Sequence, residues 1–320
     1  MILALIRKLF LTLLTLVILS IISYYILQRD PLNNLTGNDI AAYFNYVQGL
    51  VQGDWGVSHI TGEPLVQQIL NVFPSTLSLC LSALLLSLLL GIPLGFLSAT
   101  QQDNLLGKAL SMLGSIGFAI PVFWLAILLL SYASLNQWQI AAVGEIHPIY
   151  AVQTTTGVVF IDILLSDSPH QLKMLQSALQ HLALPTLILA LPATLSTMRL
   201  TEQRALYVRK QNYVKVAKIR GWSPLKIWWK HIVGNTLPPL IPMIARNFTL
   251  IFAFGMLIEN IVSWGGVGRW LISALAIQDY HSISVGVVVI GLFVLAVDLL
   301  ASLTTNLLDP SHKKDWYAIR

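Results

Sequence analysis

Residues 74–99 read PSTLSLCLSALLLSLLLGIPLGFLSA and lie within a charge-free stretch that runs from residue 64 to residue 102. A hydrocarbon core about 30 Å thick needs roughly 20 apolar residues of helix to cross it, because every backbone N–H and C=O must be satisfied within the segment. The stretch at 74–99 is long and apolar enough to cross a membrane as one helix. It predicts an all-α membrane protein.

The composition of the whole chain supports this prediction. Hydrophobic residues make up 56% of the 320 positions and charged residues only 10%, against roughly a quarter charged in an ordinary soluble domain. We see no internal repeat, low-complexity tract or soluble domain, and therefore expect a single membrane domain over residues 1–320. Six segments qualify as membrane-spanning helices, with approximate bounds 9–27, 74–99, 110–135, 181–198, 237–261 and 283–307.

The lysines and arginines predict the orientation of these helices, because basic loops stay on the cytoplasmic side. With the N-terminus inside, fifteen of the 19 basic residues fall in cytoplasmic segments, and the external loops hold only Arg29, Lys173 and Arg269. Six spans return the C-terminus to the cytoplasm, so both termini are expected there. The first apolar run is longer than the roughly 7–15 residues of the apolar h-region of a signal peptide, which favours a retained first helix.

The residue patterns of an enzyme are missing from the sequence. There is no Gly-x-x-x-x-Gly-Lys-Ser/Thr, so ATP binding by a P-loop is excluded. The seven histidines never fall at the spacing His-Glu-x-x-His, and the single cysteine, Cys80, lies in an apolar run. We expect no catalytic residue, metal site or cofactor, and no binding of nucleic acid.

The basic cytoplasmic loop at 199–235 has the signals of two short helices. The first covers 213–220, and Gly221 follows where a left-handed C-terminal cap would be placed. Ser223 and Pro224 then supply the N-cap and the first-turn proline of a second helix. Its apolar residues at i, i+3, i+4 and i+7 form one stripe, made of Leu225, Trp228, Trp229 and Ile232.

Two interpretations of the second helix remain open. It can be an interfacial anchor, with its tryptophans among lipid headgroups and its lysines near anionic lipid. Alternatively, it can insert into a groove on a cytoplasmic partner, for which anchors at this spacing are typical.

The residues of this loop resemble the EAA loop of binding-protein-dependent ABC importer permeases, in the variant of dipeptide and oligopeptide systems. The likeness rests on Tyr213-Val214-x-x-Ala217-x-x-x-Gly221, followed by His231, Asn235 and Leu237-Pro238. It extends over nearly the whole chain, since further segments resemble family motifs. These are DWGVS at 54–58, GIPLG at 91–95, PVFW at 121–124, HLALP at 181–185 and GGVGR at 265–269.

Within this family the chain is similar to the B-type permeases of the Sap peptide-transport group. The features in common are Trp264 and Trp270 around the glycine motif, the inserted loop at 156–169 and the ending DWYAIR at 315–320. This resemblance implies peptide uptake, including cationic antimicrobial peptides, and hence resistance to them.

The family resemblance also implies the partners and the location. They are a second homologous permease subunit, two cytoplasmic ABC ATPase subunits, a periplasmic solute-binding protein and a peptide substrate, with the chain embedded in the lipid of the bacterial inner membrane. ATP hydrolysis would belong to the ATPase partners. The residues expected to couple to the ATPase are Tyr213, Ala217, Gly221, Ser223, Pro224, Leu225, Trp228, Trp229 and His231.

Three charged residues fall in or at the ends of the predicted spans, namely Arg246, Glu259 and Asp298. A charge at the centre of a span costs about 2.5–3.5 kcal/mol on insertion scales, so such residues usually face a water path or a partner. We expect these three to line the translocation path or a subunit interface. Snorkelling toward the interfaces is the alternative for Arg246 and Glu259, and a helix-to-helix hydrogen bond is the alternative for Asp298.

The rival functional hypothesis is a stand-alone secondary transporter or channel, with Asp298 and Glu259 coupling transport to an ion gradient. Such proteins usually carry repeated halves, which this chain does not show. An ABC permease for a different small solute is a further alternative.

The distribution of basic residues generates a test of the topology. A reporter that is active only in the periplasm should be active when fused after Asp54 or after Gln153, and inactive when fused after Arg209 or after Ser311. Activity after Arg209 would contradict the six-span orientation.

Overall fold

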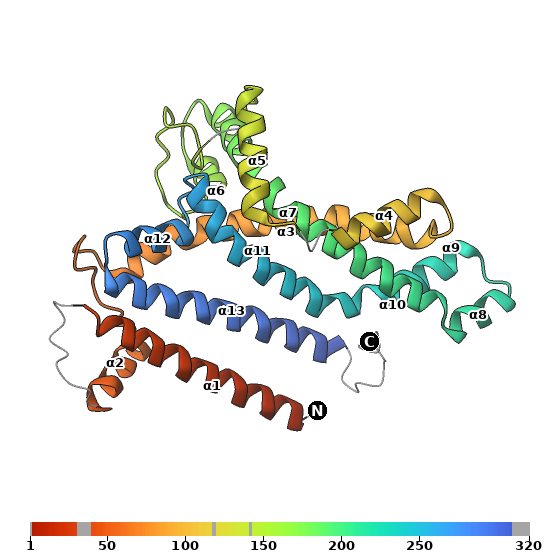
Figure 1. Ribbon diagram of the computed structural model, residues 1–320, viewed down its shortest axis with the longest axis horizontal. Helices are drawn as coiled ribbons and strands as arrows, with labels where there is room; N and C mark the ends of the chain where they lie inside the picture. Colours follow the sequence, from red (N-terminus) through yellow and green to blue (C-terminus); the bar gives the residue numbers. More distant parts are fainter. Residues whose placement is uncertain (1, 31–39, 117–119, 141–142, 309–320) are drawn as a thin grey trace. The chain divides into compact units, whose positions relative to one another are not determined.

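The structure is a computed structural model that describes residues 2–30, 40–116, 120–140 and 143–308 (Figure 1). Within this part of the chain the regular secondary structure is helical, and the β pairing consists of one isolated antiparallel bridge between Val57 and Pro64. The predicted all-α class is therefore confirmed. The predicted C-terminal motif at 315–320 lies outside the described residues.

Five helical stretches among the described residues have the length and hydropathy to cross a membrane. They correspond to the first, second, fourth, fifth and sixth predicted spans. They are Ile6–Leu27 in α1 (Ile2–Leu27), α3 (Leu65–Thr100), α7 (Gln171–Arg209), the run Pro224–Ile261 that ends with α11 (Ile241–Ile261), and Tyr280–Thr305 in α13 (Tyr280–Leu308).

The third predicted span differs from the expectation of one helix over 110–135. The structure has two helices there, α4 (Leu105–Ile116) and α5 (Val122–Leu135), and each is shorter than a span. Pro121 precedes α5 with an extended backbone, at φ −69° and ψ 115°. Because proline disfavours the helical conformation of the residue before it, the helix is interrupted here. Six continuous spans are thus not confirmed.

The remaining helices are short. They are α2 (Ile40–Gln52), α6 (Val159–Leu165), α8 (Asn212–Ile219), α9 (Pro224–Ile227), a π-helical turn at Trp228–Val233, α10 (Gly234–Thr236), a 3₁₀ turn at Pro238–Leu240 and α12 (Val267–Ala276).

The contacts within the chain form two compact units. Unit 1 consists of Met1–Ser78, Ala142–His181 and Gly255–Ala296, and unit 2 consists of Leu79–Ala141, Leu182–Phe254 and Val297–Arg320. Packing within each unit positions the candidate functional residues that belong to it.

In unit 1, hydrogen bonds join α1 to α13 and apolar packing joins α3 to α13. The hydroxyls of Ser23 and Ser284 lie 2.7 Å apart, and the Tyr46 hydroxyl of α2 lies 2.6 Å from that of Ser23. An apolar cluster joins α3 to α13 through Leu65, Ile69, Val285 and Val289. Small hydroxyl residues thus satisfy one another inside an apolar helix pair, as is common in membrane bundles.

In unit 2, glycines allow α3 to approach α7 closely. A Cβ atom at Gly95 would lie 2.5 Å from the carbonyl oxygen of Met198 and 2.6 Å from the Cβ of Thr201. A Cβ atom at Gly91 would lie 2.8 Å from the carbonyl oxygen of Thr194. The Gly-x-x-x-Gly spacing puts both glycines on one face of α3, so the two helices pack backbone against backbone.

Filling this contact should destabilise unit 2. We expect Gly95→Leu to force α3 and α7 apart, at a cost of about 1–3 kcal/mol or more for overpacking. Thr100→Leu is the matched control because Thr100 is exposed at the end of the same helix. Thermal unfolding of the detergent-solubilised variants measures the effect. Equal midpoints for both variants would contradict the close contact.

Candidate functional site

The basic loop after α7 folds as a capped pair of helices at residues 212–233, which we call the coupling hairpin after the role that the family resemblance implies. α8 ends in a glycine cap, in which Gly221 has φ +74°. The N–H of Gly221 donates to the carbonyl of Lys218 at 3.0 Å, and the N–H of Trp222 donates to that of Ala217 at 3.2 Å. This hydrogen-bond pair is the Schellman motif, and it confirms the predicted role of Gly221 in ending the first helix.

The second helix begins as predicted but does not stop before the fifth span. Ser223 is its N-cap and accepts a hydrogen bond from the N–H of Lys226, and Pro224 occupies the first turn. The helical run then continues through the π turn and the 3₁₀ turn into α11. Pro238 and Pro239 lie in that 3₁₀ turn, so these prolines change the helix type without ending the run.

The coupling hairpin packs tightly on the ends of α3 and α7. Its apolar core joins two residues of α3, two of α7, two of α8 and two of the second helix, namely Phe96, Ala99, Ala205, Val208, Val214, Ala217, Ile227 and Ile232. The Arg209 guanidinium at the end of α7 donates to the carbonyl of Ala99 at the end of α3. A displacement of the hairpin would therefore act directly on both long helices.

Aromatic and cationic side chains hold the two helices of the hairpin together. The rings of Trp222 and His231 are stacked with centroids 5.2 Å apart, and Tyr213 lies 5.6 Å from the same imidazole. The ammonium groups of Lys226 and Lys230 lie 4.4 and 5.1 Å from the centroid of the Trp222 ring. These cation–π contacts place two lysines over the hairpin. The structure brings the predicted coupling residues together at one place.

The predicted apolar stripe of the second helix is split between two faces. Trp228 packs edge-on against Phe96 at 5.2 Å and Ile232 is buried, whereas Leu225 and Trp229 are 68% and 63% exposed. The split follows from packing on one side only, because the side of the helix that carries Trp228 and Ile232 lies against the hairpin core and the side that carries Leu225 and Trp229 does not. The outward apolar surface instead includes side chains of α8. Its members are Tyr213, Val216, Ile219, Leu225 and Trp229.

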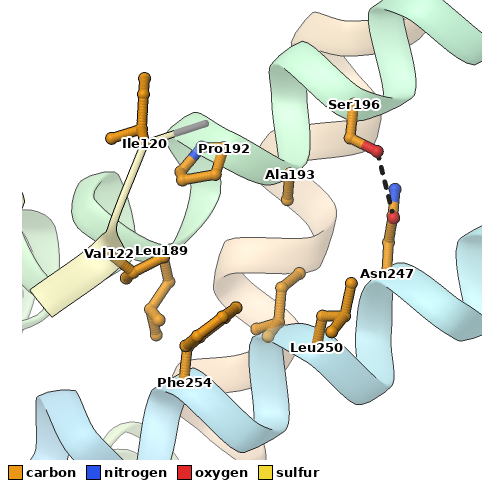
Figure 2. A pocket seen from close by; sticks show the side chains of 10 residues that line it. Ile120, Val122, Leu189, Pro192, Ala193, Ser196, Asn247, Leu250 and Phe254 are labelled. Carbon is orange, nitrogen blue, oxygen red and sulfur yellow. Dashed lines mark hydrogen bonds between the residues drawn. The ribbon is translucent and has the colours of Figure 1, made fainter. Parts of the chain in front are cut away.

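A second feature of unit 2 is an apolar cavity of about 220 Å³ between residues of α7 and α11 and the start of α5 (Figure 2). Pro192 and Phe254 line it, together with Ile120, Val122, Leu189, Ala193, Leu250 and Ile251. Ser196 and Asn247 provide its polar groups, with the Ser196 hydroxyl donating to the Asn247 amide oxygen at 3.3 Å. The amide nitrogen of Asn247 donates in turn to the Thr197 hydroxyl at 3.2 Å.

The three intramembrane charges occupy different environments. Arg246 is exposed on α11 and Asp298 is exposed on α13, both in unit 2, whereas Glu259 is fully buried in unit 1. The Glu259 carboxylate accepts the N–H of Gly268 at 2.7 Å in the first turn of α12. A Cβ atom at Gly266 would lie 2.3 Å from this carboxylate. Glu259 thus binds the N-terminus of α12, where a negative charge is favourable.

A neighbouring carboxylate, Glu145, fixes the same glycine turn. Its Oε1 accepts hydrogen bonds from the Ser75 hydroxyl at 2.5 Å and from the N–H of Gly265 at 2.9 Å. Burial raises the pKa of the Glu145 carboxyl, and these two hydrogen bonds partly oppose that effect. Sequence reasoning missed Glu145 because 120 residues separate it from Gly265.

Comparison with known proteins identifies the family. Residues 91–314 match the family described as the binding-protein-dependent transport system inner membrane component. The chain belongs to this family. The predicted resemblance to ABC importer permeases is confirmed, and this inner membrane component is a multi-pass protein of the inner membrane.

Three relatives of this inner membrane component match along almost their entire lengths. This chain is 44% identical over 307 residues to the peptide transport system permease protein SapB of Haemophilus influenzae, and the match covers 95% of this chain and 96% of the relative. It is 38% identical to the peptide transport system permease protein SapB of Salmonella typhimurium, with both chains fully covered. It is 36% identical, again over both full chains, to the putrescine export system permease protein SapB of Escherichia coli K12.

Proposed function

We propose that this chain is the transmembrane half of an ABC peptide importer, acting as one permease domain over residues 1–320. It would cross the membrane six times with both termini in the cytoplasm, α4 and α5 together making the third crossing. The proposal assigns no catalytic step to the chain itself. The energy would come from two cytoplasmic ATPase subunits, and a second homologous permease would complete the path.

The coupling hairpin is the observation that carries this proposal. Five apolar side chains are exposed on a rigid, capped and basic element, and solvent-exposed apolar patches mark interaction surfaces. The hairpin core extends into the ends of α3 and α7. A movement of the ATPase subunits transmitted to the hairpin would therefore reorient two long helices as a unit, which is the mechanical task of a permease.

A peptide is the substrate that the cavity and the relatives favour. Two of the relatives are named as peptide transport permeases. The cavity has apolar walls that suit an uncharged side chain, and Ser196 and Asn247 offer hydrogen bonds to a peptide group. A periplasmic solute-binding protein would deliver the peptide. Uptake of cationic antimicrobial peptides, and resistance to them, would follow from the same activity.

Putrescine export is the second candidate, because one relative carries that name. A dication buried in a cavity needs carboxylate partners, since an uncompensated charge is costly to remove from water. The ten residues that line the cavity include no acidic side chain. The cavity therefore favours a peptide over a diamine.

The rival secondary transporter loses support from the position of Glu259. A group that couples transport to an ion gradient has to exchange ions with water, whereas this carboxylate is fully buried and binds the α12 N-terminus. A structural role for Glu259 explains its contacts more simply.

The docking role of the hairpin predicts a loss of ATPase binding when its exposed apolar side chains are removed. We expect Trp229→Ala to weaken recovery of the ATPase at least tenfold, because truncating a large aromatic anchor commonly costs about 2 kcal/mol. Trp138→Ala is the matched control, since Trp138 is an exposed tryptophan outside the hairpin. Quantitative pull-down from equal amounts of inserted protein measures the effect. Equal recovery for both variants would favour the interfacial-anchor interpretation.

The proposed substrate predicts different effects for two cargoes. Asn247→Leu removes the amide of the cavity, so we expect peptide uptake by cells carrying the whole transporter to fall severalfold. Putrescine efflux from the same cells should not depend on the variant. The measurement uses a labelled peptide and labelled putrescine in parallel. A defect confined to putrescine would overturn the peptide assignment.

A further inference from the structure

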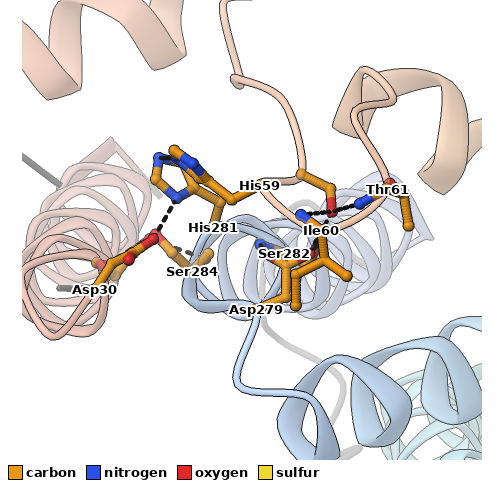
Figure 3. A network of polar contacts seen from close by, with 10 residues as sticks. Asp30, His59, Ile60, Thr61, Asp279, His281, Ser282 and Ser284 are labelled. Carbon is orange, nitrogen blue, oxygen red and sulfur yellow. Dashed lines mark hydrogen bonds and ion pairs between the residues drawn. The ribbon is translucent and has the colours of Figure 1, made fainter. Parts of the chain in front are cut away.

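Three side chains from distant parts of the sequence meet in unit 1 (Figure 3). Asp30 follows α1, His59 lies in the loop before α3, and His281 lies in the first turn of α13. The Nε2 atoms of the two histidines are 3.2 Å apart. The Nδ1 atom of His281 lies 3.2 Å from Oδ2 of Asp30. One donor atom from each of the three residues lies within 4.8 Å of the others.

The position of the two imidazoles is fixed by hydrogen bonds of their neighbours. The Ser58 hydroxyl donates to the Asp279 carboxylate at 2.5 Å, and the Ser282 hydroxyl donates to the same carboxylate oxygen at 2.6 Å. Ser58 and Asp279 are themselves buried. Because Ser58 is adjacent to His59 and Asp279 is two residues before His281, these bonds hold the loop and the start of α13 together. The backbone therefore holds the two imidazoles close to each other.

The contact with Asp30 determines which nitrogen of His281 is available. A carboxylate beside Nδ1 favours a proton on that atom, which leaves the lone pair of Nε2 available for binding. A histidine that binds a metal commonly donates its other N–H to a carboxylate in this way. Asp30 is nearly buried, with 7% of its side chain exposed, so its contact with His281 is shielded from water.

The separation of the two Nε2 atoms fits ligands of one metal ion. Two nitrogens each about 2.0–2.1 Å from a tetrahedral Zn²⁺ are about 3.3–3.4 Å apart, close to the observed 3.2 Å. The ring centroids are 4.0 Å apart, so the imidazoles would turn to direct both lone pairs at one ion. Imidazole nitrogen is a preferred ligand of Zn²⁺, Cu²⁺ and Ni²⁺. His59 is exposed, so an ion can reach the pair from solvent.

We propose that His59 and His281 bind a divalent transition-metal ion, best matched by Zn²⁺, while Asp30 orients the His281 ring through Nδ1. Water would complete the coordination. The ion would join the loop before α3 to the first turn of α13 and so stabilise unit 1. The residues of this site belong to unit 1, whereas the coupling hairpin and the cavity belong to unit 2, and the inference does not rest on the proposed peptide transport.

Titration of the purified full chain with Zn²⁺ tests the proposal, using detergent-solubilised protein without a polyhistidine tag. We expect one equivalent to bind the wild type. His59→Gln and His281→Gln should each weaken binding at least tenfold, and Asp30→Asn should weaken it about 10- to 100-fold, as removal of an orienting carboxylate does. His170→Gln should bind as the wild type does, because His170 is an exposed histidine outside the cluster. Unchanged binding in the His59→Gln/His281→Gln double variant would overturn the proposal.

Chemical modification of the wild type gives a second test that needs no variant to fold. Diethylpyrocarbonate acylates accessible imidazoles, and mass spectrometry locates the modified residues. We expect added Zn²⁺ to protect His59 and leave His170 reactive. Equal modification of His59 with and without Zn²⁺ would show that the imidazole pair makes only a hydrogen bond, and would overturn the metal site.

Discussion

The need to satisfy every backbone hydrogen bond away from water is the constraint on which the rest of this structure depends. In a hydrocarbon core an N–H or C=O group without a partner costs several kcal/mol, so a spanning segment has to be helical. Because lipid is as apolar as the helix surface, the hydrophobic effect does little to hold such helices together, and close packing and hydrogen bonds have to do it. The close packing is seen where α3 meets α7 at Gly91 and Gly95, and the hydrogen bonding is seen between Ser23 and Ser284.

The same constraint explains where the buried polar groups lie. Glu259 is fully buried yet reaches the free N–H groups at the start of α12, and Glu145 reaches Gly265 from a distant loop. Both carboxylates meet backbone at glycines, where any side chain would collide with them. A buried acid can therefore serve to bind the start of a neighbouring helix, as Glu259 does for α12, and an intramembrane acid is not in itself a transport group.

The coupling hairpin combines a packed interior with exposed apolar side chains. Its Schellman cap, the stack of Trp222 on His231 and its core with α3 and α7 supply the rigidity. The two adjacent tryptophans lie on different faces of the helix, with Trp228 packed against Phe96 and Trp229 exposed. One aromatic residue then stabilises the hairpin while its neighbour remains available to a partner.

The sequence by itself determined the helical class, the family and the caps of the hairpin, because length, apolarity, Gly221 and Ser223 act locally. It also placed five of the spans, while the interruption at Pro121 divided the third into two helices. Only the tertiary structure decided which side of the second hairpin helix faces outward, since this depends on how the helix packs against α3 and α7. It also decided that Glu259 binds α12 and that His59 meets His281. Those pairings join residues far apart in the chain, and local spacing carries no information about them. The two histidines come together only when α13 and the loop before α3 pack against each other.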